Sequence, residues 1–191
     1  MMRIFMFALF FGGMALAAGC GSGNQSDREE GLISDTEKHR RMKAEIDSLE
    51  QIIYDDDFAF DPEMVSDLKQ RYEKFAQRFG GDEEKSAEYL YKAGALSRAL
   101  GMPTEGVKIY RRLLTKFSGY ARAPEVQFLI AFTYDEDLNE KELAEEAYNE
   151  VINKFPGDHW ALQAERRLET LYMTDEEMVR FFMERNRVED Q

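Results

Sequence analysis

Cysteine and histidine are nearly absent from this chain of 191 residues, which has 1 Cys and 2 His. One thiol cannot form a disulfide framework or a cysteine-built zinc site, and two imidazoles leave few parts for the common catalytic and metal centres. Positive charge is also scarce, because 25 Lys and Arg stand against 38 Asp and Glu. Nucleic acid and anionic membrane surfaces would repel a chain with a net charge of −13, so we expect neither as a partner.

The first 20 residues have the pattern of an export signal. Arg3 precedes an apolar run of 15 residues, 4–18, which is shorter than the ~20 residues that a membrane-spanning helix needs. The run leads into Leu16-Ala17-Ala18-Gly19-Cys20, which resembles the bacterial lipobox. That resemblance implies that residues 1–19 are a lipoprotein signal peptide and that Cys20 carries lipid, including palmitate. The alternative is an ordinary signal peptide that ends at an unmodified cysteine.

The residues after Cys20 bear on the destination of the chain. Gly21 stands where an Asp would resemble an inner-membrane retention signal, so the outer membrane is favoured. Residues 20–33 begin with small polar residues and predict a flexible tether that faces the periplasm, with exposure at the cell surface left open. Because the chain is acidic, lipid and not charge has to hold it at the membrane.

One motif occurs three times at intervals of 38 residues. Its apolar positions fall at i, i+3 and i+7, on one face of a helix, with a cation in the last turn and a glycine just beyond. Each copy therefore predicts a helix C-terminus, with the glycine in a backbone conformation that other residues avoid. The copies are Tyr72-x-x-Phe75-x-x-Arg78-Phe79-x-Gly81, Tyr110-x-x-Leu113-x-x-Lys116-Phe117-x-Gly119 and Tyr148-x-x-Val151-x-x-Lys154-Phe155-x-Gly157.

A second helix-length segment precedes the later copies of the motif. These segments span 86–100 and 124–137, and they break at 101–103 and near 138–139. The unit is therefore helix, tight turn, helix, followed by a connection to the next unit. Small residues four positions before the motif tyrosine allow the two helices to approach closely, and these are Gly106 and Ala144.

These units resemble the tetratricopeptide repeat family over residues 86–171. The residues at the family's small and aromatic packing positions are Gly94, Gly101, Gly106, Tyr110, Ala131, Ala144, Tyr148 and Pro156. The period of 38 exceeds the family's usual 34, and the surplus fits best in the connection 118–124. The resemblance implies an all-α chain, a short α-solenoid of helix-turn-helix repeats, that binds proteins without catalysis or cofactors.

The segments at either end of these repeats complete the predicted organisation. Residues 34–81 predict a degenerate N-terminal helical pair, 82–157 two repeats, and 158–191 C-terminal capping helices. The spacing of Met42, Ile46, Leu49 and Ile53 also permits a short coiled coil, which stays open as an alternative. A capping box, Thr174-x-x-Glu177, opens a last helix whose inward side chains are predicted to be Met178, Phe181 and Phe182.

The residues that could suggest chemistry have simpler structural interpretations. We expect the motif tyrosines and phenylalanines to be core residues, because a repeat unit buries its apolar face against its neighbour. Asp135, Asp137, Asn139 and Glu146 have the acid spacing of a calcium loop but lack its glycine, so we expect a solvated acidic turn and no metal. His39 and His159 lack partners nearby in sequence, and we expect both to be exposed. No catalytic residue is predicted.

A binding surface, if helical periodicity is followed, lies on the first helix of each unit, which lines the inner curve of a solenoid. This reasoning predicts two sets of binding residues: Tyr91, Ala95 and Arg98, then Leu129, Thr133 and Glu136.

The combination of lipobox and repeats resembles small tetratricopeptide lipoproteins of Bacteroidota and the lipoprotein component of the outer-membrane β-barrel assembly machinery. It implies a non-catalytic, lipid-anchored scaffold that binds envelope proteins and has no small-molecule substrate. One alternative is a Tol-Pal or peptidoglycan-synthesis partner with an N-terminal coiled coil. A more distant alternative is an envelope hydrolase that uses carboxylates.

Overall fold

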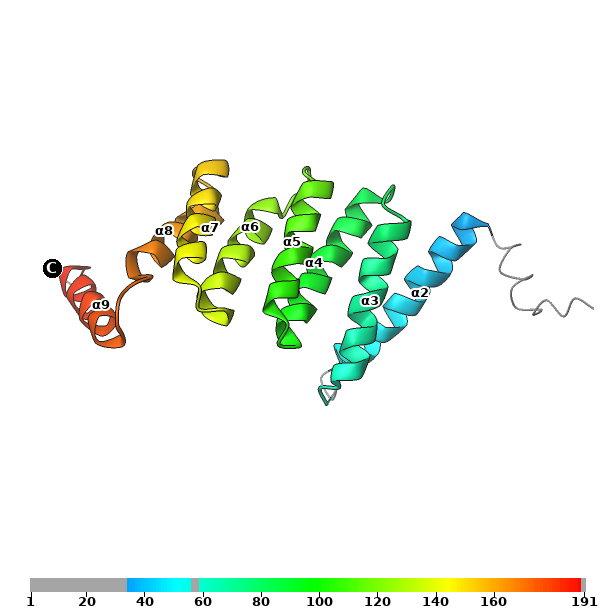
Figure 1. Ribbon diagram of the computed structural model, residues 1–191, viewed down its shortest axis with the longest axis horizontal. Helices are drawn as coiled ribbons and strands as arrows, with labels where there is room; N and C mark the ends of the chain where they lie inside the picture. The colour runs from blue at the N-terminus through cyan, green and yellow to red at the C-terminus, as the bar shows by residue number, and fades with distance from the viewer. Residues whose placement is uncertain (1–33, 56–58, 190–191) are drawn as a thin grey trace, which may run out of the picture. The chain divides into compact units, whose positions relative to one another are not determined.

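The computed structural model describes residues 34–55 and 59–189, so the predicted signal peptide, Cys20 and the tether lie outside the described residues. The packing described below belongs to one compact unit, Thr36–Gln191. Within the described ranges every regular element is a helix, which confirms the all-α prediction (Figure 1). The helices are α2 (Asp35–Ile53), α3 (Pro62–Arg78), α4 (Glu83–Ala99), α5 (Pro103–Lys116), α6 (Ala123–Phe132), α7 (Lys141–Lys154), α8 (His159–Thr170) and α9 (Asp175–Glu189), with a π-helical turn, η1 (Thr133–Asp137), after α6.

Each copy of the motif ends a helix, as the spacing predicts. The C-cap residues are Phe79, Phe117 and Phe155, and each backbone N–H donates to the carbonyl of the residue four positions earlier. The prediction for the glycines is wrong in two copies: φ is positive at Gly157 (79°) but not at Gly81 or Gly119. All three copies close the next turn with the same hydrogen bond between residues three apart, and that bond does not require a left-handed residue.

Acidic and hydroxyl side chains begin several of the helices. Asp82 accepts a hydrogen bond from the backbone N–H of Lys85, so α4 starts three residues earlier than the apolar spacing alone predicts. Asp158 accepts one from Trp160 at the start of α8. At α9, Thr174 and Glu177 exchange hydrogen bonds, which confirms the predicted capping box.

The motif tyrosines form the centre of the core. Tyr72, Tyr110 and Tyr148 are fully buried, together with the residue three positions further along each motif, as predicted. From α3 to α8, successive helices lie side by side (Figure 1). Helix α4 can approach α5 closely because Gly94 faces the ring of Tyr110. A β-carbon on Gly94 would come within 2.6 Å of Tyr110 Cδ1, well inside van der Waals contact. These packed helix pairs make the fold an all-α solenoid.

Helix α2 places its apolar seam against this core. Ile46 and Ile53 are buried, and Met42 and Leu49 pack partly against the same cluster. In the coiled-coil alternative these four side chains would contact a second chain. In the structure they pack against the core of their own chain instead. The prediction that His39 is exposed is wrong: it is half-buried, with its ring 5.0 Å from that of Phe75 and Nε2 3.1 Å from the Asp82 carboxylate. A histidine flanked by charged residues in sequence can still pack on another helix.

The acidic turn after α6 also differs from the prediction. The π-helical turn η1 shifts the register of the chain, and Asn139 follows with φ of 53°. As a result Asp135 is buried instead of solvated, and its carboxylate accepts hydrogen bonds from Lys141 (2.6 Å) and Tyr148 (3.2 Å). Internal donors therefore occupy the carboxylate that the calcium spacing would use first.

The C-terminal helices cover the end of the repeats less completely than predicted. Met178 and Phe181 are half-buried, but Phe182 is 47% exposed, so its predicted inward position is wrong. His159 is exposed, as expected, and its ring contacts Trp160 edge-on. No helix in the described ranges combines the length and the apolar character that crossing a membrane requires.

Candidate protein-binding surface

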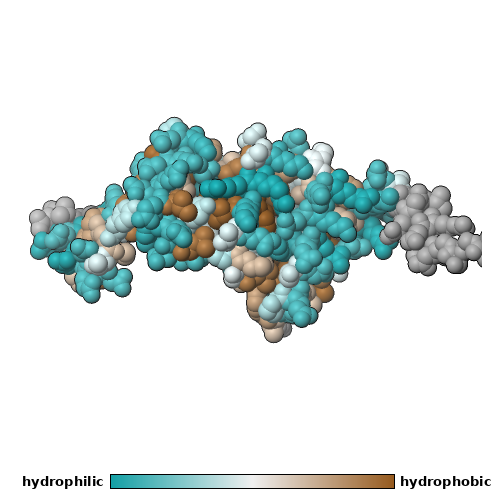
Figure 2. All heavy atoms as spheres, in the orientation of Figure 1, coloured by the Kyte–Doolittle hydropathy of each residue, from teal (hydrophilic) through white to brown (hydrophobic). Residues whose placement is uncertain are grey.

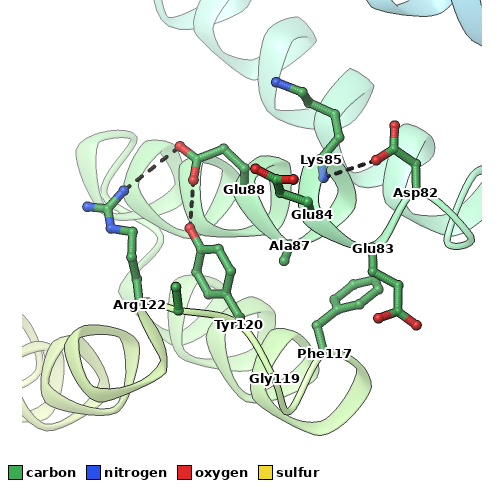
Figure 3. Close-up of a pocket in the computed structure, with 11 residues that line it drawn as sticks. Asp82, Glu83, Glu84, Lys85, Ala87, Glu88, Phe117, Gly119, Tyr120 and Arg122 are labelled. Atoms are coloured by element: carbon green, nitrogen blue, oxygen red, sulfur yellow. Dashed lines mark hydrogen bonds and ion pairs between the residues drawn. The ribbon is translucent and has the colours of Figure 1, made fainter.

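A cleft lies between the start of α4 and the loop that joins α5 to α6 (Figure 3). Its volume is about 780 Å³. Two elements that are separated along the chain build it, so its shape depends on how the α5–α6 loop packs beside α4. The lining residues are Asp82, Glu83, Glu84, Lys85, Ala87, Glu88, Phe117, Gly119, Tyr120, Ala121 and Arg122.

The floor of the cleft is apolar. Ala87 is buried on α4, and Phe117, the C-cap residue of α5, is 5% exposed. Figure 3 shows the rings of Phe117 and Tyr120 directed from the loop side toward α4. An apolar floor of this kind gains free energy when a partner's side chain displaces water from it.

Hydrogen bonds hold one wall of the cleft in place. The Tyr120 hydroxyl donates to Glu88 on α4 (2.6 Å), and the Arg122 guanidinium donates to Glu125 at the start of α6 (2.8 Å). Glu125 also accepts from Tyr91 (2.8 Å), whose ring lies 3.8 Å from the Arg122 guanidinium carbon. This network joins α4, the α5–α6 loop and α6, so the wall is formed before any partner arrives.

The ionisation of this network follows from its burial and its partners. Burial favours the neutral form of Glu125, but hydrogen bonds from Arg122 and Tyr91 outweigh it and lower the pKa of the carboxyl group. Burial, reinforced by Glu125, raises the pKa of Tyr91 to about 12. Burial and Glu88 also raise the pKa of Tyr120. Both phenols are therefore protonated donors at neutral pH, and Glu125 is a charged acceptor.

The rim of the cleft is mainly acidic. Glu83 and Glu84 are exposed in the first turn of α4, where negative charge also complements the helix dipole. Within the part of the chain that the structure describes, neither carboxylate has a cationic partner. An apolar floor inside such a rim suits a segment that presents a basic side chain next to an apolar one.

The structure distributes the sequence-predicted binding residues over three different environments. Tyr91 is half-buried and supports the cleft from behind, because its hydroxyl donates to Glu125 and its ring contacts Arg122. Arg98 is half-buried and pairs with Asp137 across the repeat boundary (2.5 Å). Leu129 is half-buried against the core, and Glu136 is exposed and pairs with Arg167 of α8 (2.6 Å).

Thr133 does not lie on this surface. Its side chain is fully buried, and Oγ1 donates to the carbonyl of Leu129 (2.6 Å). The reason is the π-helical turn, which begins at Thr133. A π-helical turn changes the direction of the side chains, so the face predicted for Thr133 from regular α-helical spacing does not apply. Ala95, one turn from Tyr91 on α4, is exposed.

Sequence reasoning missed the residues of the α5–α6 loop. Phe117 was predicted as a core residue, while Tyr120 and Arg122 had no predicted role. One signal could have indicated them: the period of 38 places its extra residues in this connection, and the extra length supplies Tyr120, Ala121 and Arg122 to the cleft. Among the described residues, no group of three or more His, Cys, Asp or Glu side chains is arranged to hold a metal ion.

Comparison with known proteins agrees with the geometry of the helix pairs. The tetratricopeptide repeat matches residues 88–119 and 125–158, which cover most of α4 to α7. The unmatched residues between the two segments include Tyr120, Ala121 and Arg122 of the cleft. A search among curated proteins gave no match. Tetratricopeptide repeats commonly bind other proteins and generally lack catalytic activity. The two matched segments are thus similar to tetratricopeptide repeats, and the stack of paired helices in which they lie is an all-α solenoid.

Proposed function

We propose that this chain is a non-catalytic scaffold, anchored by lipid at Cys20 to the periplasmic face of the outer membrane, that binds another envelope protein. The repeat matches over residues 88–119 and 125–158 are the observation that carries the scaffold role. The cleft between α4 and the α5–α6 loop is the surface that we assign to the partner.

The anchor rests on the residues that end the N-terminal apolar run. Cys20 is the chain's one cysteine, and it stands at the position where a lipobox places its acylated thiol. Several acyl chains give stable membrane attachment, at ~0.8 kcal/mol for each buried CH₂ group. Labelling of cells with radioactive palmitate, followed by membrane fractionation, tests this step. We expect label in the outer-membrane fraction with the native chain and none with Cys20→Ser, and an unlabelled native chain would refute the anchor.

The partner is expected to be a protein with an exposed basic and apolar segment. The described rim carries unpaired carboxylates, and the floor carries the rings of Phe117 and Tyr120. A partner of this kind would gain both apolar burial and charge complementarity, the second of which mainly increases the association rate and specificity.

Photocrosslinking in native membranes identifies the partner. A photoreactive residue at Ala121, which is exposed in the cleft, should give a covalent product with one envelope protein. The same residue at Leu143, an exposed apolar position on α7 outside the cleft, is the matched control. Recovery of β-barrel assembly proteins would assign the chain to that machinery, and recovery of Tol-Pal proteins would assign it there. Equal products from both positions, or none from Ala121, would refute the cleft as the binding surface.

The coiled-coil version of the Tol-Pal alternative has less support than the scaffold. Ile46 and Ile53, half of its proposed seam, are buried in the core of the described unit. Exposing them would remove two large apolar side chains from the core, at roughly 1.5–3 kcal/mol each.

A further inference from the structure

Helix α9 carries a stripe of exposed apolar side chains. Val179 is 53% exposed, Phe182 47% and Met183 68%, and at ~100° per residue the three fall within an arc of about 100°. We call these three residues the α9 stripe. Monomeric proteins rarely leave several large apolar residues together on one helix face, so a cluster of this kind marks a contact surface.

The α9 stripe is separate from the face that α9 turns toward α8. The side chains of Phe181 and Glu184 line a hollow between the two helices together with Leu168 and Tyr172 of the α8 side. Arg185 pairs with Glu169 of α8 (3.4 Å). Because these contacts use the opposite flank of α9, the stripe keeps its exposure after α9 has packed on α8.

Charges at the two ends of the stripe indicate what covers it. Glu176 lies six residues before Phe182 and Arg187 lies five residues after it, and both are exposed. On an ideal helix the two fall within about 20° of each other, along the same edge of the stripe. Glu176 thus stands near the start of this edge and Arg187 near its end, with the stripe's centre midway between, while Arg180, next to them on the side of α8, lines the hollow.

We propose that the α9 stripe is the contact between two copies of this chain, paired antiparallel about a two-fold axis near Phe182. A two-fold axis perpendicular to both helices keeps each edge on the same side and exchanges its ends. Glu176 of one copy therefore faces Arg187 of the other, and the same pair forms a second time by symmetry. A parallel arrangement about an axis along the helices would instead place this edge of the two copies on opposite sides of the contact, so Glu176 and Arg187 would not face each other. The proposal does not depend on the lipid anchor or on the cleft.

Site-specific photocrosslinking of the full chain in its membrane tests the contact. Two differently tagged copies are expressed together, each with a photoreactive residue at Val179. We expect a product of twice the chain's mass that carries both tags, whereas the control position Leu143 gives none, although it is also an exposed apolar residue. Failure to form the doubly tagged product, or capture of a different protein or of lipid instead, would overturn the proposal.

Charge exchange tests the antiparallel register. Glu176→Arg and Arg187→Glu each place two like-charged pairs at the contact, and we expect each to lower the yield of doubly tagged product several-fold. The double variant restores both opposite-charge pairs and should restore the yield. Helix content measured by circular dichroism confirms that all variants fold alike. Single variants that crosslink as well as the parent, or a double variant that crosslinks no better than the singles, would overturn the antiparallel pairing.

Discussion

The three motif tyrosines occupy equivalent positions in the repeats, yet their hydroxyl groups differ in hydrogen bonding. The Tyr72 hydroxyl donates to the Glu50 carboxylate (2.6 Å), and the Tyr148 hydroxyl donates to Asp135 (3.2 Å). The Tyr110 hydroxyl is buried and, within the described ranges, has no hydrogen-bond partner. Substitution by phenylalanine removes only the hydroxyl group at each position, so each of the three variants serves as a control for the other two.

The expected costs follow from what each hydroxyl loses. A hydrogen bond to a charged acceptor contributes roughly 1.5–3 kcal/mol, so we expect Tyr72→Phe to lower the free energy of unfolding by about 2 kcal/mol. Tyr148→Phe has a longer bond, and Asp135 keeps Lys141 as a donor, so we expect a loss of about 1–2 kcal/mol. Tyr110→Phe removes an unsatisfied buried polar atom, and we expect a change of about 0 or a small gain in stability.

Urea denaturation of the purified variants, followed by circular dichroism, measures these differences. The predicted order of stability is Tyr110→Phe at or above the parent, then Tyr148→Phe, then Tyr72→Phe. If Tyr110→Phe lowers the free energy of unfolding as much as Tyr72→Phe does, the Tyr110 hydroxyl must have a hydrogen-bond partner. That result would refute the explanation of the three variants by their different hydrogen bonds.

Two further predictions concern the packing of α4 and the response to acid. Gly94→Ala should lower the melting temperature by about 4–8 °C, because its β-carbon overlaps the buried ring of Tyr110, whereas Gly119→Ala, which meets open space, should leave the melting curve unchanged. Burial opposes ionisation of Glu50, but hydrogen bonds from Lys92 and Tyr72 outweigh it and lower the pKa of the carboxyl group in the folded state. The stability that Glu50 adds is therefore present above its unfolded pKa of about 4.3 and is lost as the pH falls through the lower folded value. Unfolding free energies measured from pH 7 to pH 3 should fall less steeply for Glu50→Gln than for the parent or for the exposed control Glu84→Gln, and three parallel profiles would contradict this assignment.

Sequence patterns predicted the repeats because the structure that each pattern indicates is determined by residues close together in the chain. The motif couples an apolar helix face to a C-terminal cation and a turn, and these features depend on neighbours a few residues away. The motif copies therefore end helices as predicted, and the tyrosines are buried. The three glycines share one spacing but not one conformation, since only Gly157 needs a positive φ.

Contacts between distant segments were harder to predict. His39 follows a run of charged residues, and only the packing of α2 on α3 brings it against Phe75 and Asp82. Asp135 and Thr133 became buried because a π-helical turn interrupted the regular phase of α6, and periodicity cannot anticipate such a turn. The cleft required the extra residues of the α5–α6 connection to be placed beside α4. Spacing located this insertion but could not give its contacts.

The central claim, that the cleft binds an envelope partner through its acidic rim, is tested most directly by reversing the charge of that rim. Glu83→Lys with Glu84→Lys is compared with Glu142→Lys and Glu146→Lys, which change the net charge equally at exposed positions on α7. The measurement is the amount of partner captured by the photoreactive residue at Ala121 in native membranes. We predict a loss of most of the captured partner for the rim variant and full capture for the α7 variant. Equal capture by both, or an equal loss in both, would contradict the assignment.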